Sequence, residues 1–333
     1  MKRKVVIISL IVFVLSVLLT ACVPSSTPEP TDIPPMPTTV PDTPVPTEKP
    51  EPEPEPISVI DDLGAEIILE VSAQSIISIS PNLTEIIFGI GAGDRLIGRD
   101  TNSQYPEGAL EAVDLGAMWD GIPVEDILAL EPDLILAGEI YAPEAIQKLR
   151  DLGLTVYWQA NPHDFEGLFT NIMDVSVLTG NVEEADELVI SLNDRVVLLE
   201  EKLENVENIP LVFYELDASD PANPWTTGAD TFISYIISKA RGKNLGDVLE
   251  GEWVQISSEE LVAQNPDYIL LADALYGISP ESVAERPGWS AISAVVNGRL
   301  VAFDPFILSV PGPRLVDGLE LVAELLHSEL FGN

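Results

Sequence analysis

The sequence predicts an α/β protein with two Rossmann-like lobes, whose mostly parallel sheets are joined by a single long spanning helix. Short apolar segments alternate with helical segments, one amphipathic helical segment of about 25 residues interrupts this alternation, and the alternation then restarts. Residues 124–136 and 258–270 also resemble each other, because both contain an acidic helix start, an Ala near the helix end, Pro-Asp and an apolar strand. Such an internal repeat predicts two similar lobes that face each other.

The first 22 residues have the pattern of a bacterial lipoprotein signal. Lys2, Arg3 and Lys4 precede an apolar run from Val5 to Leu19, and small residues lead to Cys22, the only cysteine. In this pattern the thiol of the cysteine is acylated, and the cysteine becomes the new N-terminal residue. We therefore expect lipidation at Cys22 and an extracytoplasmic, membrane-anchored protein. The alternative is an uncleaved transmembrane anchor, for which the run is slightly short. One cysteine allows no disulfide within the mature chain.

Residues 23–56 are predicted to form a Pro/Glu/Thr-rich disordered linker. Thirteen of these residues are proline, which lacks the N–H that helices and sheet ladders need. An extended spacer of this length, at about 3.1 Å per residue, spans on the order of 100 Å. The linker therefore predicts a folded part that is held at a distance from the membrane.

The charge of the chain excludes some partners. The chain has a formal net charge of −39, and removal of the three basic signal residues leaves about −42. Phosphate binding needs a basic face, so we expect no nucleic-acid partner. Anionic lipid headgroups would be repelled by the same surface.

The N-terminal lobe is predicted over residues 57–180. Ser80 is expected to cap the first helix, with Pro81 in its first turn and Glu85 near the positive end of its dipole. The expected elements, in order, are two short strands over 57–71, a strand over 75–79, a helix from 81 to about 89, a strand over 95–98, a helix over 124–130, a strand over 134–137, a helix over 143–152, a strand over 155–158 and a helix over 165–180.

The interdomain helix is predicted within residues 181–207, and the C-terminal lobe over 208–333. The expected elements of this lobe are a strand over 210–215, helices over 230–239 and 258–264, a strand over 267–271, a helix that starts at 281, a strand over 299–303 and a closing helix over 313–330.

Four segments carry a family resemblance: Ser80–Glu85, Leu130–Ile135, Gly228 followed by Lys243-Asn244, and Arg314–Glu320. In this order they resemble the substrate-binding proteins of bacterial ATP-binding-cassette (ABC) importers that handle cobalamin, ferric siderophores and haem, over Ile57 to Phe331. The resemblance implies a monomeric, membrane-tethered receptor that captures a metal-centred ligand between its lobes. Its partners would be an ABC importer permease dimer and the ATPase subunits, and no cofactor would be needed.

Within this family the cobalamin binders are the nearest likeness. Their cleft motifs appear here as Trp119-Asp120-Gly121, Trp253 four residues before Ser257, Asp304-Pro305-Phe306 and Pro313-Arg314. A flat macrocycle with polar amide edges needs aromatic walls and a few hydrogen-bonding groups. The ligand-binding candidates are Trp119, Trp253, Asp304, Phe306, Asn102 and Trp225.

The sequence departs from the cobalamin binders at two points, and other roles stay open for the candidate tryptophans. Asn102 stands where those proteins have an aromatic residue, and the Asp304 loop is longer before Pro313. Trp119 and Trp253 are also compatible with a place in the core or at a lobe rim, although both are expected in loops.

Ferric siderophores and haem are the alternative ligands. Triply anionic catecholate complexes need several basic groups, and only Arg99 and Arg314 are candidates, with Arg314 expected to cap or pair within the closing helix. Haem iron needs a His or Tyr ligand. The two histidines, His163 and His327, are expected at the surface. Three tyrosines remain as candidate ligands: Tyr105, Tyr141 and Tyr276.

Glu125 and Glu259 begin the two repeated acidic helices. In the resembled family an acidic residue on each lobe docks onto the permease dimer, which implies this role for both glutamates. Acidic groups at helix starts also simply stabilise the helix dipole.

The sequence contains no recognisable catalytic motif, and we expect that the protein is not an enzyme. A nucleophile elbow, a phosphate-binding glycine loop, a cysteine pair and a zinc motif are all missing, so no metal site is predicted. Gly89–Gly93 follows a helix rather than a strand, which argues against dinucleotide binding. A surface hydrolase with a reactive carboxylate pair and a structural wall lipoprotein remain alternatives of another class.

Overall fold

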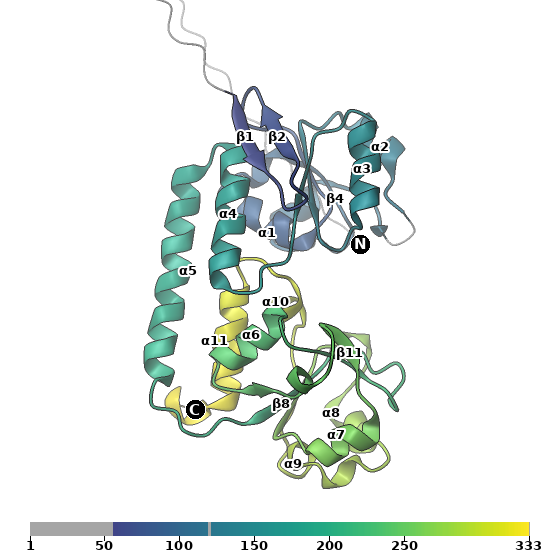
Figure 1. Ribbon diagram of the computed structural model, residues 1–333, viewed down its shortest axis with the longest axis vertical. Helices are drawn as coiled ribbons and strands as arrows, with labels where there is room; N and C mark the ends of the chain where they lie inside the picture. Colours follow the sequence, from purple (N-terminus) through teal and green to yellow (C-terminus); the bar gives the residue numbers. More distant parts are fainter. Residues whose placement is uncertain (1–55, 119–120, 333) are drawn as a thin grey trace, which may run out of the picture. The chain divides into compact units, whose positions relative to one another are not determined.

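The computed structural model describes residues 56–118 and 121–332 (Figure 1). The signal segment, Cys22, the linker before Pro56, Trp119 and Asp120 lie outside the described residues. Among the helices of the described part, none is both long and apolar enough to cross a bilayer.

The N-terminal lobe consists of a hairpin and a parallel sheet. The hairpin pairs β1 with β2 in antiparallel register, and the five-stranded sheet has the order β5-β4-β3-β6-β7 with parallel neighbours throughout. The strands are β1 (Ile57–Ile60), β2 (Glu66–Leu69), β3 (Ile76–Ser78), β4 (Leu96–Arg99), β5 (Val113–Asp114), β6 (Leu134–Gly138) and β7 (Val156–Gln159). The helices are α1 (Pro81–Gly89), α2 (Val124–Ala129), α3 (Pro143–Asp151) and α4 (Phe165–Thr179).

One long helix, α5 (Val182–Leu203), joins this lobe to the next and runs beside α4 (Figure 1). On the side of the second lobe, Arg195 of α5 donates to Asp317 at 2.5 Å and to Glu320 at 2.7 and 3.0 Å, and both acceptors lie on α11 (Leu315–Leu326). The bridging helix is therefore tied along its length to a helix from each lobe.

The C-terminal lobe repeats the parallel arrangement in a four-stranded sheet of order β10-β8-β12-β13. A separate antiparallel pair, β9 and β11, lies outside this sheet. The strands are β8 (Leu211–Glu215), β9 (Trp225–Thr227), β10 (Lys243–Asn244), β11 (Trp253–Gln255), β12 (Tyr268–Leu271) and β13 (Leu300–Ala302). The helices before α11 are α6 (Phe232–Lys239), α7 (Ser258–Gln264), α8 (Pro280–Ala284), α9 (Ser293–Val296) and α10 (Phe306–Ser309).

The aspartates of the two repeated Pro-Asp segments make equivalent hydrogen bonds in the two lobes. The Asp133 carboxylate accepts the N–H groups of Gln74 and Ser75, each at 2.9 Å, and the Asp267 carboxylate accepts the Leu211 N–H at 2.9 Å. Each aspartate thereby fixes the start of its strand to the start of a neighbouring parallel strand. These backbone N–H donors, that of Gln74 first, hold the pKa of Asp133 below its ordinary value.

The fold class and the alternation of elements are confirmed, whereas two local predictions are wrong and one pair of strands was missed. Ser80 precedes α1, but its hydroxyl donates to Asn82 Oδ1 instead of accepting a backbone N–H. The closing helix ends at Leu326 rather than 330, because a short 3₁₀ turn over Ser328–Leu330 follows. The pair β9–β11 was not predicted, since its strands are only three residues long.

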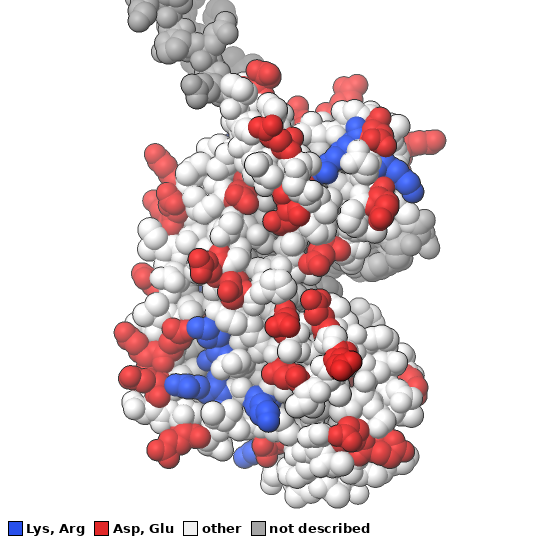
Figure 2. All heavy atoms as spheres, viewed as in Figure 1, with Lys and Arg blue, Asp and Glu red and all other residues white. Residues whose placement is uncertain are grey.

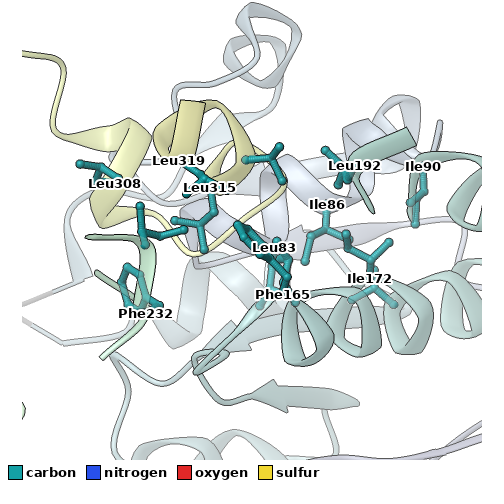
Figure 3. Packing of buried hydrophobic residues seen from close by; sticks show 14 of the residues in the cluster. Leu83, Ile86, Ile90, Phe165, Ile172, Leu192, Phe232, Leu308, Leu315 and Leu319 are labelled. Carbon is teal, nitrogen blue, oxygen red and sulfur yellow. The ribbon is translucent and has the colours of Figure 1, made fainter. Parts of the chain in front are cut away.

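A continuous hydrophobic core extends from one lobe to the other (Figure 3). Leu83 of α1, Phe165 of α4, Phe232 of α6 and Leu315 of α11 belong to one cluster of buried side chains, which also includes Leu192 of the bridging helix. Because both lobes share this core, large relative movement of the lobes would expose apolar surface.

Candidate ligand-binding site

The two lobes enclose a cavity of about 620 Å³. This volume lies within the usual range of small-molecule sites, about 300–1,000 Å³. The N-terminal lobe lines it with Ser80, Pro81, Asn82, Asn102, Glu139, Ile140 and Asn161, and the C-terminal lobe with Phe232, Glu252, Trp253, Tyr276, Phe306, Ser309, Val310 and Pro311.

The N-terminal half of the cavity is built at the carboxyl ends of parallel strands. Ser80, Asn102, Glu139 and Asn161 follow β3, β4, β6 and β7 respectively. From β3 the chain moves outwards to β4 and β5 on one side, and it then returns to add β6 and β7 on the other, so the switch point between β3 and β6 opens a crevice. Gly138 lets these ends approach closely, since a Cβ there would lie 2.5 Å from Ser80 Oγ.

The C-terminal half supplies aromatic walls. Trp253 is 42% exposed and packs edge-to-face on Phe232, with 6.2 Å between the ring centroids. Tyr276 is 83% exposed, and Phe306 is 37% exposed on the same cavity. Large exposed aromatic groups that gather at one concave place mark a binding surface.

The charged groups of the cavity wall are acidic. Glu139 and Glu252 line it from opposite lobes, whereas its described lining contains no Lys, Arg or His. The Glu139 carboxylate also accepts the Asn161 backbone N–H at 2.8 Å. Acidic side chains are spread over the face of the protein seen in Figure 2, whereas basic ones gather in a few places. The cavity wall therefore has the same sign of charge as most of this outer surface.

A side pocket of about 170 Å³ adjoins the cavity and shares Pro81, Asn102, Phe306 and Val310 with it. At its wall Arg314 of the C-terminal lobe donates from Nε and Nη2 to Glu85 Oε1 of the N-terminal lobe, at 2.9 and 2.5 Å. The Arg314 guanidinium also lies 3.9 Å from the centroid of the Tyr105 ring. We call Glu85, Tyr105 and Arg314 the clasp.

Glu85 is nearly buried, and this burial raises the pKa of its carboxyl from 4.5 to about 7. The ion pair with Arg314 opposes the rise, and the negative charge of Asp317 adds to it. Oε2 of Glu85 has no hydrogen-bond partner among the described residues. The clasp thus contains a carboxyl group that changes charge near neutral pH.

Comparison with known proteins supports the resemblance. The model of the periplasmic binding protein family matches residues 76–305. The chain belongs to the periplasmic binding protein family.

Individual members of the family are similar over most of the chain. An uncharacterized ABC transporter substrate-binding lipoprotein, YvrC of Bacillus subtilis, is 30% identical over 278 residues, 83% of this chain and 87% of the relative. The crystal structure of the vitamin B12-binding protein of Vibrio cholerae is 28% identical with a TM-score of 0.66, covering 77% of this chain and 97% of that one. A haem-binding protein from Roseiflexus has a TM-score of 0.70 at 24% identity, over 78% of this chain and all of that one, and shares the fold. Each of these relatives is a binding protein, and YvrC is one of an ABC transporter.

The structure of this binding protein brings most of the sequence-derived ligand candidates together. Trp253, Phe306 and Asn102 line the cavity, and Asp304 lines the side pocket. Trp253 lies on β11, however, and not in a loop as expected. Trp225 lies on the paired strand β9, is 38% exposed and is absent from the described cavity lining. Trp119 lies outside the described residues.

The basic residues considered for anionic ligands are already engaged. Arg99 is buried, forms an ion pair with Asp114 at 3.3 Å and donates to the Asp100 carbonyl at 2.9 Å. Arg314 pairs with Glu85 across the lobes, so the expectation that it pairs within its own helix is wrong. The cavity offers an anionic ligand no free guanidinium from either residue.

The candidate haem ligands are placed differently from one another. The Tyr141 hydroxyl is buried and donates to the Ile79 carbonyl at 2.7 Å, and burial raises its pKa, so it is unsuited to bind iron. His163 is exposed as expected, but His327 is buried against the Ala240 carbonyl, contrary to the prediction. No cluster of three or more potential metal ligands exists in the part of the chain that the structure describes.

Several cavity residues were not found in the sequence. Glu139 and Asn161 directly follow parallel strands, so the rule that ligands bind at the carboxyl ends of such strands would have found them. Phe232 and Glu252 reach the cavity only through the packing of the second lobe, and nothing in their local sequence marks them, whereas Tyr276 was named only as a candidate haem ligand.

The two glutamates predicted to dock onto a permease lie at equivalent places in the two repeats. Glu125 is exposed in the first turn of α2, and Glu259 is exposed in the first turn of α7. Neither lines the cavity.

Proposed function

We propose that this protein captures cobalamin or a related corrinoid between its lobes and delivers it to the permease of an ABC importer. The observation that carries this proposal is the composition of the cavity, which combines aromatic walls, amide side chains and two carboxylates with no described basic group. The name of the Vibrio cholerae relative, a vitamin B12-binding protein, supports the same ligand class.

A corrinoid matches this cavity chemically. Its flat and largely apolar ring packs on Trp253, Phe306 and Tyr276, and apolar burial supplies most of the affinity. Its rim carries amide groups, whose N–H donors suit Glu139 and Glu252. Such ligands are neutral or cationic, so the negative wall does not repel them.

Ferric catecholate siderophores fit less well. Each anionic group near Glu139 or Glu252 would be repelled by about 4 kcal/mol at 4 Å, for an effective dielectric constant near 20. Neither Arg99 nor Arg314 is free to offset this repulsion.

Haem is the second candidate, and Tyr276 is the observation in its favour. This side chain is 83% exposed on the cavity, and a tyrosine phenolate is a known haem ligand. The carboxylates of haem would still face Glu139 and Glu252, which favours the corrinoid.

The tether and the docking surface complete the proposal. Cys22 would be acylated, and the proline-rich linker would let the folded part reach the permease from the membrane surface. Glu125 and Glu259, one on each repeat, would contact basic groups on the two permease subunits.

Titration of the full chain, purified in detergent, tests the ligand class. Cyanocobalamin should quench tryptophan fluorescence saturably, with a Kd below about 1 µM, and free tryptophan amide serves as the control for light absorption by the ligand. Haemin and a ferric tris-catecholate are titrated in parallel. Tighter binding of haemin would favour the second candidate, and no response to cyanocobalamin would refute the corrinoid proposal.

A further inference from the structure

The side pocket lies where one arm of a cavity ligand can enter it. It shares four lining residues with the main cavity, so the two spaces are neighbours on one wall. A volume of about 170 Å³ equals the share of roughly five or six water molecules at about 30 Å³ each. It therefore accommodates a short substituent and excludes a macrocycle.

The charges of the pocket disfavour an anionic arm. Glu85 and Asp304 are acidic, and Arg314 is the only basic residue among the described lining. Arg314 already donates twice to Glu85, and its other face lies against the Tyr105 ring. A ligand carboxylate could reach Arg314 only in competition with the Glu85 carboxylate.

An uncharged carboxamide suits the same groups. Glu85 is 4% exposed and lines the pocket, and its Oε2 is a buried acceptor without a partner among the described residues, which an amide N–H inserted beside it would satisfy. The side chain of Asn102, which lines both spaces, offers an amide to the ligand carbonyl. Asn82 lies one turn before Glu85 on α1, and its buried Nδ2 also has no partner among the described residues.

We propose that the side pocket is a subsite for one peripheral arm of the ligand, and that the Glu85–Arg314 pair makes it select a carboxamide over a carboxylate unless Glu85 takes up a proton. This inference rests on the corrinoid function proposed above. Protonated Glu85 no longer neutralises Arg314, whose guanidinium is then available to a ligand carboxylate.

The charged and titratable groups around Glu85 come from three parts of the chain. Arg314 faces it from the position just before α11 and Asp317 from the first turn of α11. Tyr105 lies in the loop after β4, and Asp304 acts on Arg314 from the loop after β13. Burial places the pKa of Glu85 at about 7, so the selectivity should change between pH 5.5 and 8.5.

The test compares cyanocobalamin with its monocarboxylate derivatives, in each of which one peripheral amide is hydrolysed. With a pKa of about 7, roughly 97% of Glu85 is protonated at pH 5.5 and roughly 3% at pH 8.5. At least one derivative should therefore bind the full chain about 30-fold more tightly at pH 5.5 than at pH 8.5, whereas the affinity for cyanocobalamin changes far less.

Two variants and one control identify the responsible group. Glu85→Gln should remove the pH dependence for that derivative. The double variant Glu85→Gln/Arg314→Gln should remove it too, and it removes both charges of the ion pair, so it serves if Glu85→Gln alone fails to fold. Glu252→Gln removes one charge from the main cavity instead, and should retain the pH dependence.

The outcomes separate the two proposals. If the wild-type chain does not bind cyanocobalamin, the corrinoid function and the inference that rests on it are both overturned. If it binds cyanocobalamin but treats every derivative alike at both pH values, or if Glu85→Gln keeps the effect, only the subsite is overturned.

Discussion

Glu85 should lower the free energy of unfolding of this protein by about 2 to 3 kcal/mol as the pH rises from 5 to 8. The carboxyl is 4% exposed, and burial raises its pKa from 4.5 to about 7 despite the ion pair with Arg314. A carboxyl whose pKa is raised on folding binds its proton more tightly in the folded state. Its contribution to stability is therefore complete below pH 4.5 and is lost as the pH rises through 7.

The magnitude follows from the size of the shift. Each pKa unit corresponds to about 1.4 kcal/mol, and most of the interval between 4.5 and 7 lies within the range from pH 5 to 8. Glu85→Gln keeps the shape of the side chain but cannot titrate. Wild-type Glu85 is itself neutral at pH 5, so the variant should lie close to the wild type there, and its slope against pH should be shallower.

Urea denaturation at pH 5 and pH 8, followed by circular dichroism, measures both quantities. The other buried carboxyls, including Asp100 and Glu215, are present in both proteins, so the difference between the two slopes isolates Glu85. Glu259→Gln, which removes an exposed charge from α7, is the matched control and should keep the wild-type slope. A slope difference below about 1 kcal/mol over this interval would refute the burial argument.

Three further predictions concern the cavity, the docking surface and the second lobe. Trp253→Ala should weaken corrinoid binding about 30-fold by titration, whereas Trp225→Ala on the paired strand should change it little; equal effects would remove Trp253 from the site. Glu125→Arg combined with Glu259→Arg should spare binding and abolish uptake of radiolabelled cobalamin by cells, and normal uptake would contradict docking through these residues. Gly228→Ala should destabilise the fold by about 3 kcal/mol in a denaturant titration, because the new Cβ would lie 1.9 Å from the Gly251 carbonyl oxygen. Wild-type stability of this variant would show that the backbone can move apart without cost.

The sequence predicted those features that depend on neighbouring residues. The alternation of strands and helices and the long bridging helix are periodic patterns, and they were placed within a few residues of their observed bounds. The repeated Pro-Asp segments were recognised as equivalent, and the structure gives the physical reason, since Asp133 and Asp267 each bind the backbone of a neighbouring strand.

Features that depend on distant residues were not predicted. Glu85 and Arg314 are 229 positions apart, and each looked like a helix-terminal charge on its own segment. The strand that carries Trp253 exists only because its backbone pairs with that of β9, from another part of the lobe. Sequence reasoning therefore found Trp253 and Phe306 by resemblance, but missed Glu139 and the acidity of the cavity.

The closing helix α11, rather than the bridging helix alone, controls how the lobes can move. Its side chains Leu315 and Leu319 share a core with α1, its first turn follows Arg314, and its Asp317 and Glu320 hold Arg195 of α5. A rotation of one lobe must break the clasp or carry α11 along with α1, and both options cost buried contacts. The shared contacts therefore oppose a wide closing movement of the lobes. The clasp is the part of this arrangement whose charge changes near neutral pH, because burial raises the pKa of Glu85 to about 7.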